Sequence, residues 1–167
     1  MGLFSFLKSA GSKLVENKAA ENTAKTATTS SSATLDALKE SARKSKISML
    51  ESAVRATGIP VDNLSLDLDD DKVTVYGNVE STSEKEKVVL VLGNVNGIAT
   101  VDDRLSVVKT EPESDFYEVK KGDTLSKIAK QFYGDMMKYP VIFEANKPML
   151  TNPDLIYPGQ VLRIPKL

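Results

Sequence analysis

The sequence has 167 residues, enough for one medium-sized domain or two small ones. Its 22 basic and 23 acidic residues give a formal net charge of -1 at pH 7, and nothing in this balance indicates the basic face of a nucleic-acid-binding protein. The chain contains no Cys and no His. This excludes thiol chemistry, disulfides, histidine acid–base catalysis and the usual zinc ligands.

The N-terminal segment, residues 1–16, carries apolar residues at helical spacing: Leu3, Leu7, Ala10 and Leu14. Such a helix could lie on a membrane surface, with Lys8, Lys13 and Lys18 as anchors. Alternatively it packs on the domain that follows, and we favour packing. The opening run has no positive residue before it and is interrupted by Lys8, unlike a secretion signal.

No stretch approaches the ~20 apolar residues of a membrane span. We therefore expect a cytoplasmic protein without a transmembrane segment. Residues 17–34 consist of Ala, Thr, Ser, Lys, Glu and Asn with no large apolar residue after Val15, which predicts a flexible polar linker.

Residues 35–108 alternate between helical and strand patterns. A helix is expected from Leu35 to Gly58, and a second from Ser81 to Leu92, capped by Ser81 or Ser83. Strands are expected at residues 64–69, 73–76 and 100–108. The order helix, strand, strand, helix, strand predicts an α/β sandwich.

One acidic cluster falls between the first two of these strands, and it comprises Asp67, Asp69, Asp70 and Asp71. Four carboxylates could bind a cation, but their spacing lacks the glycine and distal Glu of a calcium loop. We favour a solvated hairpin turn.

Residues 116–167 read as strand, helix, helix, strand. Phe116 to Lys120 contains β-formers, and Asp123 is expected to cap a helix whose apolar face ends before Gly134. A second helix should begin near Pro140, because proline is tolerated only in a first turn. The last strand is expected at residues 160–164.

This C-terminal part resembles a LysM domain in three blocks: Tyr117 to Ala129, Ile142 to Lys147 and Ile156 to Pro165. The resemblance implies a groove for N-acetylglucosamine-containing glycans such as peptidoglycan. Matching positions are Gly122, Asp123, Thr124, Leu125, Asn152, Pro153, Leu155 and Ile156. The same residues could equally serve as helix cap, core and turn.

The middle part resembles a BON domain, through Gly77, the apolar helix and the tail from Val95 to Leu105. An acidic linker, residues 109–115, joins it to the LysM-like part. The whole arrangement, with its Met-Gly-Leu-Phe opening, resembles the family of small bacterial cytoplasmic potassium-binding proteins. The overall expectation is an α+β fold of two small domains.

Potassium suits a cage of neutral carbonyl oxygens, and such oxygens are free at helix ends and glycine-broken turns. Residues 7–11 and 93–98 supply two such places. Carried over from the resemblance, the backbone ligands would be Leu7, Ala10, Gly93, Val95 and Ile98. Without the resemblance, residues 93–98 could be an ordinary helix C-terminus.

We therefore expect a non-enzymatic, monomeric potassium binder or sensor that becomes more compact when the ion binds. The LysM-like part would support the BON-like domain or contact a glycan or an unidentified protein. The alternative is a glycan-binding protein acting in envelope maintenance or stress. We find no nucleophile–base set, phosphate loop or metal cluster that would indicate an enzyme.

Overall fold

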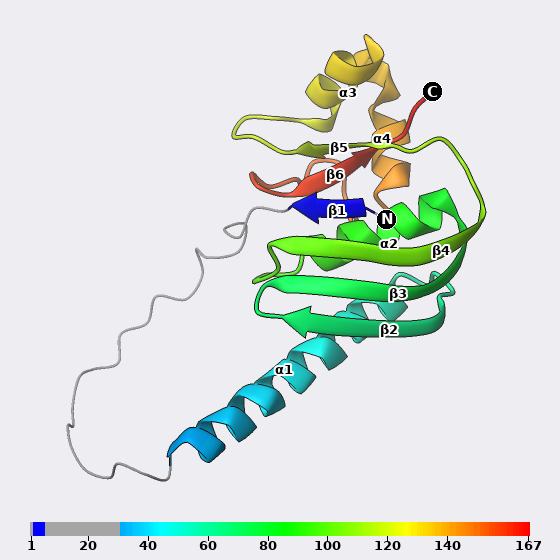
Figure 1. The fold of residues 1–167 in the computed structure, drawn as a ribbon. Helices are drawn as coiled ribbons and strands as arrows, with labels where there is room; N and C mark the ends of the chain where they lie inside the picture. The colour runs from blue at the N-terminus through cyan, green and yellow to red at the C-terminus, as the bar shows by residue number, and fades with distance from the viewer. Residues whose placement is uncertain (1, 6–30) are drawn as a thin grey trace, which may run out of the picture.

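The structure is a computed structural model that describes residues 2–5 and 31–167, and it has an α+β architecture with two sheets (Figure 1). The larger sheet has the strand order β1-β4-β3-β2. Its strands are β1 (Gly2–Ser5), β2 (Asp62–Asp69), β3 (Lys72–Ser81) and β4 (Thr100–Lys109). β2 and β3 form an antiparallel hairpin, β3 and β4 are parallel, and β1 adds antiparallel to β4.

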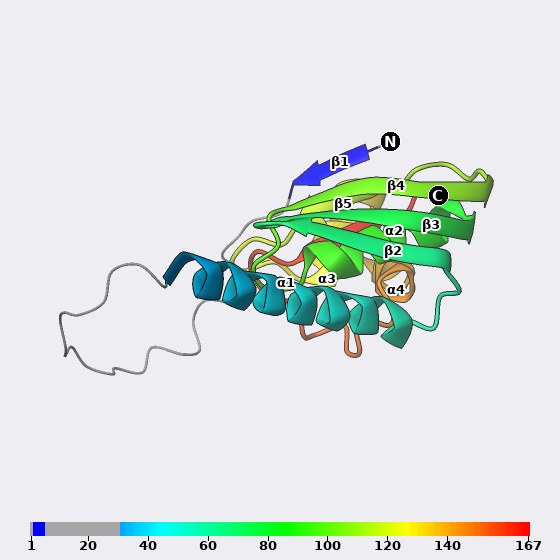
Figure 2. The same cartoon turned by 60° about the horizontal axis from the view of Figure 1, so that its bottom comes forward.

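Two helices cover one face of this sheet, as Figure 2 shows. They are α1 (Ser31–Ala56) and α2 (Thr82–Gly93), and α2 makes the crossover between the parallel strands β3 and β4. Leu50 and Val54 of α1 and Val88 and Leu92 of α2 are fully buried against the sheet. The predicted α/β sandwich is confirmed, because these apolar residues recur at the helical spacing seen in the sequence.

The predicted strands and helices of this part appear with shifted ends. β3 is longer than expected and continues through Gly77, whose φ is +149°. A Cβ at Gly77 would lie 2.9 Å from the Asp62 carbonyl oxygen, so a side chain cannot be accommodated. At α2 the cap is Ser81, which accepts a hydrogen bond from the Glu84 amide while the Glu84 carboxylate accepts from the Ser81 amide.

The helical prediction is wrong for Gly2–Ser5, which form strand β1. Phe4 lies opposite Val101, and Leu3 lies opposite Asp102. The backbone groups of β4 on this edge need partners, and a strand supplies them where a helix cannot. The predicted positions Leu7, Ala10 and Leu14 lie outside the described residues.

Helix α1 begins at Ser31, four residues before the predicted start at Leu35 and inside the stretch expected to be a linker. Serine at a helix start is favourable, and the apolar pattern extends no further back. Residues 17–30 of the predicted linker lie outside the described part of the chain.

The smaller sheet pairs β5 (Asp115–Glu118) antiparallel with β6 (Val161–Ile164). Between these strands come α3 (Leu125–Tyr133), the short 3-10 helix η1 (Met136–Lys138) and α4 (Tyr139–Ala145). Gly134 ends α3 with φ +73°, and Pro140 lies in the first turn of α4, as predicted. The element η1 was not predicted, because three residues show no periodicity.

The two parts of the molecule pack against each other. Val161 of β6 belongs to the core of the larger sheet, and Phe116 and Met149 pack on that core. The Phe4 ring of β1 contacts the Phe116 ring of β5 with centroids 5.2 Å apart. Thus β1 contributes to the larger sheet and to the contact between the two parts. None of the helices in the described ranges 2–5 and 31–167 is long and apolar enough to cross a membrane.

Candidate functional site

The loop that follows α2, residues 93–98, turns the chain from the helix into β4. Asn94 caps the helix, and its amide donates to the Leu90 carbonyl oxygen at 3.1 Å. The Val95 amide donates to Leu92 and the Ile98 amide donates to Val95, at 3.2 and 3.1 Å. Gly97 has φ +83°, a conformation that favours glycine, so the predicted glycine-broken turn is present.

Three of the predicted ion ligands lie in this loop. The carbonyl oxygens of Gly93 and Ile98 accept no hydrogen bond from any described residue, whereas the Val95 oxygen accepts one. Gly93 and Ile98 are buried. Neutral oxygens at the negative end of a helix form a donor set that fits a monovalent cation, since potassium is held by carbonyl oxygens in place of water.

Strand β1 runs toward this loop. Ser5 is paired with Thr100, two residues beyond Ile98, so the C-terminal end of β1 lies near the end of this loop. The other two predicted ligands, Leu7 and Ala10, lie outside the described residues. The structure therefore brings three of the five predicted ligands into one loop.

The Asn94 side chain links the loop to the smaller sheet. Its Nδ2 donates to the Val161 carbonyl oxygen at 3.1 Å, and its Oδ1 accepts from the Val161 amide at 3.0 Å. Nδ2 also lies 2.9 Å from the Leu90 oxygen and 3.3 Å from the Met149 sulfur. Sequence reasoning missed this role, because a helix-capping asparagine needs no distant partner.

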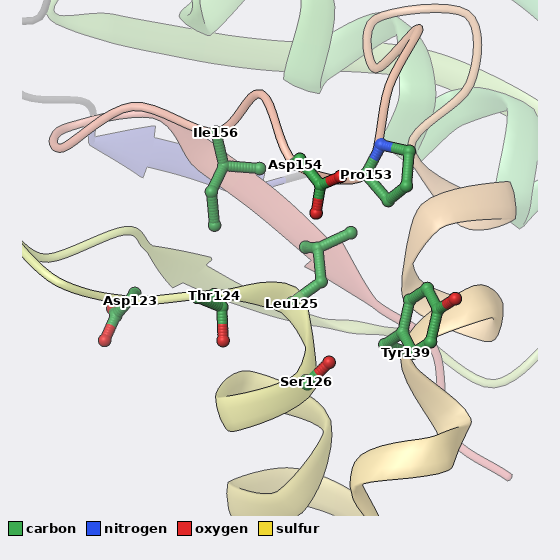
Figure 3. Close-up of a pocket in the computed structure, with 8 residues that line it drawn as sticks. All are labelled: Asp123, Thr124, Leu125, Ser126, Tyr139, Pro153, Asp154 and Ile156. Carbon is green, nitrogen blue, oxygen red and sulfur yellow. The ribbon is translucent and has the colours of Figure 1, made fainter.

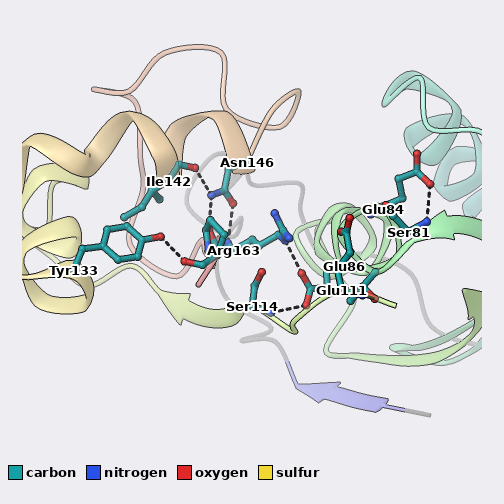
Figure 4. A network of polar contacts seen from close by, with 11 residues as sticks. Ser81, Glu84, Glu86, Glu111, Ser114, Tyr133, Ile142, Asn146 and Arg163 are labelled. Carbon is teal, nitrogen blue, oxygen red and sulfur yellow. Dashed lines mark hydrogen bonds and ion pairs between the residues drawn. The ribbon is translucent and has the colours of Figure 1, made fainter. Parts of the chain in front are cut away.

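A buried ion pair forms a second link between the parts (Figure 4). Glu86 of α2 accepts from Arg163 Nε of β6 at 2.6 Å and from the Ser114 amide at 2.7 Å. Both side chains are almost fully buried, at 3% and 9% exposure. Sequence reasoning did not single out Glu86, because nothing in a helix sequence distinguishes a buried acid from an exposed one.

A pocket of about 310 Å³ opens between the start of α3 and the loop before β6 (Figure 3). Its lining residues are Asp123, Thr124, Leu125, Ser126, Tyr139, Pro153, Asp154 and Ile156. It contains five of the eight positions predicted for glycan contact. Gly122, Asn152 and Leu155 do not line it, and Ser126, Tyr139 and Asp154 were not predicted.

The prediction that Asp123 caps α3 is wrong. Thr124 is the cap, and its Oγ1 accepts from the Lys127 amide at 3.3 Å. The Asp123 carboxylate instead accepts from the Tyr117 hydroxyl at 2.9 Å and from the Lys120 amide at 2.8 Å, which closes the turn after β5. Burial, reinforced by the Asp123 carboxylate, raises the pKa of Tyr117 above its usual value of 10.0.

The rival cation site in the acidic cluster is not supported. Asp67 forms an ion pair with Arg43 of α1, and Asp70 adopts φ +51° in the hairpin turn. Within residues 2–5 and 31–167, no three carboxylate, His or Cys side chains gather as metal ligands would. This agrees with the preferred interpretation of a hairpin turn.

Comparison with known proteins agrees with this architecture. Residues 47–109 match the BON domain family and residues 117–165 match the LysM domain family. The fold and the site thus define a protein that joins a BON domain to a C-terminal LysM domain.

The chain is 44% identical over 167 residues to the potassium binding protein Kbp of Escherichia coli, covering 99% of both chains. It belongs to the same family as that protein. An uncharacterised protein of Deinococcus radiodurans is 38% identical over 129 residues, which is 68% of this chain and 49% of that protein. Protein YqbP of Bacillus subtilis, also uncharacterised, is 39% identical over 67 residues, or 35% of this chain and 30% of its own length.

Proposed function

We propose that this protein binds potassium ions through backbone carbonyl oxygens of residues 93–98 together with the N-terminal segment. The observation that carries the proposal is the full-length similarity to the potassium binding protein Kbp. The loop geometry supports it, because the carbonyl oxygens of two buried residues, Gly93 and Ile98, have no hydrogen-bond donor among the described residues.

The ligands proposed here are Leu7, Ala10, Gly93, Val95 and Ile98, all through backbone oxygens. Carbonyl oxygens carry only a partial charge, so they replace the weak hydration of K⁺ without favouring a divalent ion as carboxylates would. Because Ser5 pairs with Thr100, a chain leaving β1 starts beside the loop that would supply the other ligands.

Ion binding would draw the part of the N-terminal segment that follows β1 onto the BON domain and shift the protein toward a more compact state. A ligand that binds only one state raises the population of that state as the ligand concentration rises, which is how a sensor reports potassium. In this proposal the protein is a non-enzymatic, cytoplasmic monomer with a role in stress responses. The expected units are an N-terminal segment (1–16), a linker (17–34), the BON domain (35–108), a second linker (109–115) and the LysM domain (116–167), and the start of α1 at Ser31 moves the end of the first linker to residue 30.

Amide NMR spectra recorded during titration with KCl test the proposal, with NaCl at equal ionic strength as the control. We expect saturable, potassium-specific shifts for residues 7–11 and 93–98. A variant lacking residues 1–11 should lose selective binding. The same response to both salts would reject potassium binding.

A second candidate function is glycan binding at the LysM pocket. The observation that favours it is the clustering of Asp123, Thr124, Leu125, Pro153 and Ile156 around one cavity, with the polar groups of Ser126, Tyr139 and Asp154 added. Such a mix of apolar walls and a few polar groups is typical of small-ligand sites.

Titration with soluble chitin oligomers tests the glycan site. We expect shifts at the amides of Thr124 and Leu125, and loss of those shifts in Tyr139→Ala. If the oligomers leave these amides unchanged while KCl still shifts residues 93–98, the LysM domain serves instead as a packing partner or binds a protein.

A further inference from the structure

One lysine of α1 lies on the loop that carries the proposed ion ligands. The Lys46 Nζ donates to the Gly97 carbonyl oxygen at 2.9 Å. A Cβ built on Gly97 would lie 3.2 Å from that Nζ, so the ammonium group lies directly against the turn. Gly97 immediately precedes Ile98, one of the proposed ligands.

No carboxylate of a described residue lies within ion-pair distance of the Lys46 ammonium group. Its neighbour Lys44 points to solvent, with 74% of its side chain exposed, and pairs with Glu40. Lys46 is partly buried and directs its charge at a backbone oxygen. A partly buried charge without a counter-ion is less screened than one in solvent, so its field reaches neighbouring groups.

We propose that Lys46 determines the ion selectivity of the carbonyl loop, acting as a fixed positive charge that disfavours divalent cations. This inference rests on the proposed function, because it assigns a property to the same ion site. The ammonium group satisfies the Gly97 oxygen, while the Gly93 and Ile98 oxygens accept no hydrogen bond from a described residue and remain for the ion. It therefore positions the loop and also imposes a charge beside it.

The argument for selectivity follows from Coulomb's law. The repulsion between Lys46 and a bound ion is proportional to the charge of the ion, so a divalent ion is repelled twice as strongly as a monovalent one at the same place. Carbonyl oxygens also attract a divalent ion of similar size, although they do not favour it as carboxylates would. The lysine offsets this attraction without adding a side-chain ligand.

The test compares KCl with BaCl₂, because Ba²⁺ has nearly the radius of K⁺ and twice its charge. Binding of each ion is measured by calorimetry on the full chain, as wild type, Lys46→Met, Lys46→Arg and Lys44→Met. We expect Lys46→Met to bind K⁺ on the order of tenfold more tightly and Ba²⁺ on the order of a hundredfold more tightly, since doubling the ionic charge doubles the repulsion removed. The preference for K⁺ over Ba²⁺ then falls about tenfold, in line with that factor of two.

Two variants separate charge from packing. Lys46→Arg keeps the charge and should keep the selectivity of the wild type. Lys44→Met removes the same charge from the solvent side of the same helix, and its selectivity should change less than about twofold because solvent screens that site. Thermal unfolding without added ion verifies that each variant is folded, and Lys46→Gln provides a polar replacement if Lys46→Met does not fold.

The inference is overturned if Lys46→Met or Lys46→Gln changes the affinities for K⁺ and Ba²⁺ by the same factor or weakens both. Such a result would mean that Lys46 only holds the loop in shape. If the wild type itself bound no K⁺, the proposed function would fail first, and the two failures are thus distinguishable.

Discussion

Two asparagines in different domains make the same kind of bonds to one strand, β6. Asn94 ends α2 of the BON domain, and Asn146 ends α4 of the LysM domain. Each donates from Nδ2 to the carbonyl oxygen four residues earlier in its own helix, at 2.9 and 2.7 Å. Each also bonds both backbone groups of one residue of β6, Val161 for Asn94 and Arg163 for Asn146.

Strand β6 pairs with β5 on one side, and its other edge would expose unpaired amides and carbonyls. The two side-chain amides close this edge, because a carboxamide offers the same donor and acceptor as a peptide group. The difference is in burial. Asn146 is 1% exposed and acts within its own domain, whereas Asn94 is partly exposed and acts across the joint. One bond set therefore supports the fold of a domain, and the other holds two domains together.

The largest effect is expected from Asn146→Ala. The change leaves the buried Arg163 amide and carbonyl and the Ile142 carbonyl without this partner, and each unsatisfied buried group costs about 1–3 kcal/mol. We expect the free energy of unfolding of the LysM domain to fall by about 4 kcal/mol, the summed cost of leaving these three backbone groups without this partner. Urea unfolding followed by tyrosine fluorescence measures it.

The control for that change is Asn152→Ala, which removes an exposed asparagine whose Oδ1 accepts only a local bond from the Asp154 amide. It should cost less than about 1 kcal/mol, the usual size of an exposed hydrogen bond. Equal losses in the two variants would mean that the β6 edge does not depend on Asn146.

The next largest effect is expected from breaking the ion pair between Glu86 and Arg163, which links the two domains. Glu86→Gln removes the negative charge and leaves Arg163 buried without its counter-ion. Breaking a buried pair from one side costs about 3–5 kcal/mol, and glutamine keeps an acceptor, so we expect about 3 kcal/mol. Calorimetric unfolding should show the loss, and the exposed Glu80→Gln should leave stability unchanged.

Asn94→Ala is expected to cost less, about 2 kcal/mol, because solvent can reach the groups it leaves. Its signature differs from that of Asn146→Ala. The two domains should unfold in separate calorimetric transitions, since the variant loses a link between them while each core stays intact. A single transition with an unchanged midpoint would show that the hydrophobic contact around Val161 and Phe116 is sufficient. Asn96→Ala, in the same loop but exposed, is the matched control.

Much of the fold could be predicted from the sequence, because the apolar periodicity of α1, α2 and α3 reports directly which face each helix buries. The predicted strands also occur, with ends shifted by a few residues. The prediction failed at Gly2–Ser5, where four residues fit either a helix or a strand. Only the free edge of β4, which is distant in sequence, decides between them.

The candidate sites were predicted less completely, because they too depend on contacts between residues that are distant in the sequence. Gly93, Val95 and Ile98 share one loop, so their proximity is local. In contrast, the partners of Asn94, Glu86 and Lys46 lie 67, 77 and 51 residues away in the chain. The sequence does not indicate that a polar residue in a helix has such a distant partner. Asp123 is the opposite case, because its position suits a helix cap, yet its carboxylate bonds Tyr117 instead.

The smallest effect concerns the far end of β6, where Tyr133 donates to the Pro165 carbonyl oxygen at 2.7 Å. Burial raises the pKa of Tyr133 above its usual value of 10.0, with the nearby Arg163 opposing the shift and Asp115 adding to it. The folded state therefore favours the neutral phenol. The contribution of the Tyr133 phenol to folding stability is complete below pH 10 and is lost as the pH rises through the raised pKa.

Tyr133→Phe should lower stability at neutral pH by about 1 kcal/mol, the usual net value of one hydrogen bond. Above pH 10 the wild type should lose stability faster than the variant, so the two curves of stability against pH converge.

Tyr117 has a raised pKa as well, caused first by burial and then by Asp123, so the single variant should still lose some stability at alkaline pH. The free energy of unfolding of the double variant Tyr117→Phe/Tyr133→Phe should hardly change between about pH 9 and 11. This range brackets the pKa of about 10 of an unperturbed tyrosine. A steep decline in that variant would place the alkaline sensitivity in the lysines instead. Convergence of the wild-type and Tyr133→Phe curves would show that a neutral hydrogen bond holds the LysM side of β6. The two asparagines bond the strand in the same way, through neutral groups.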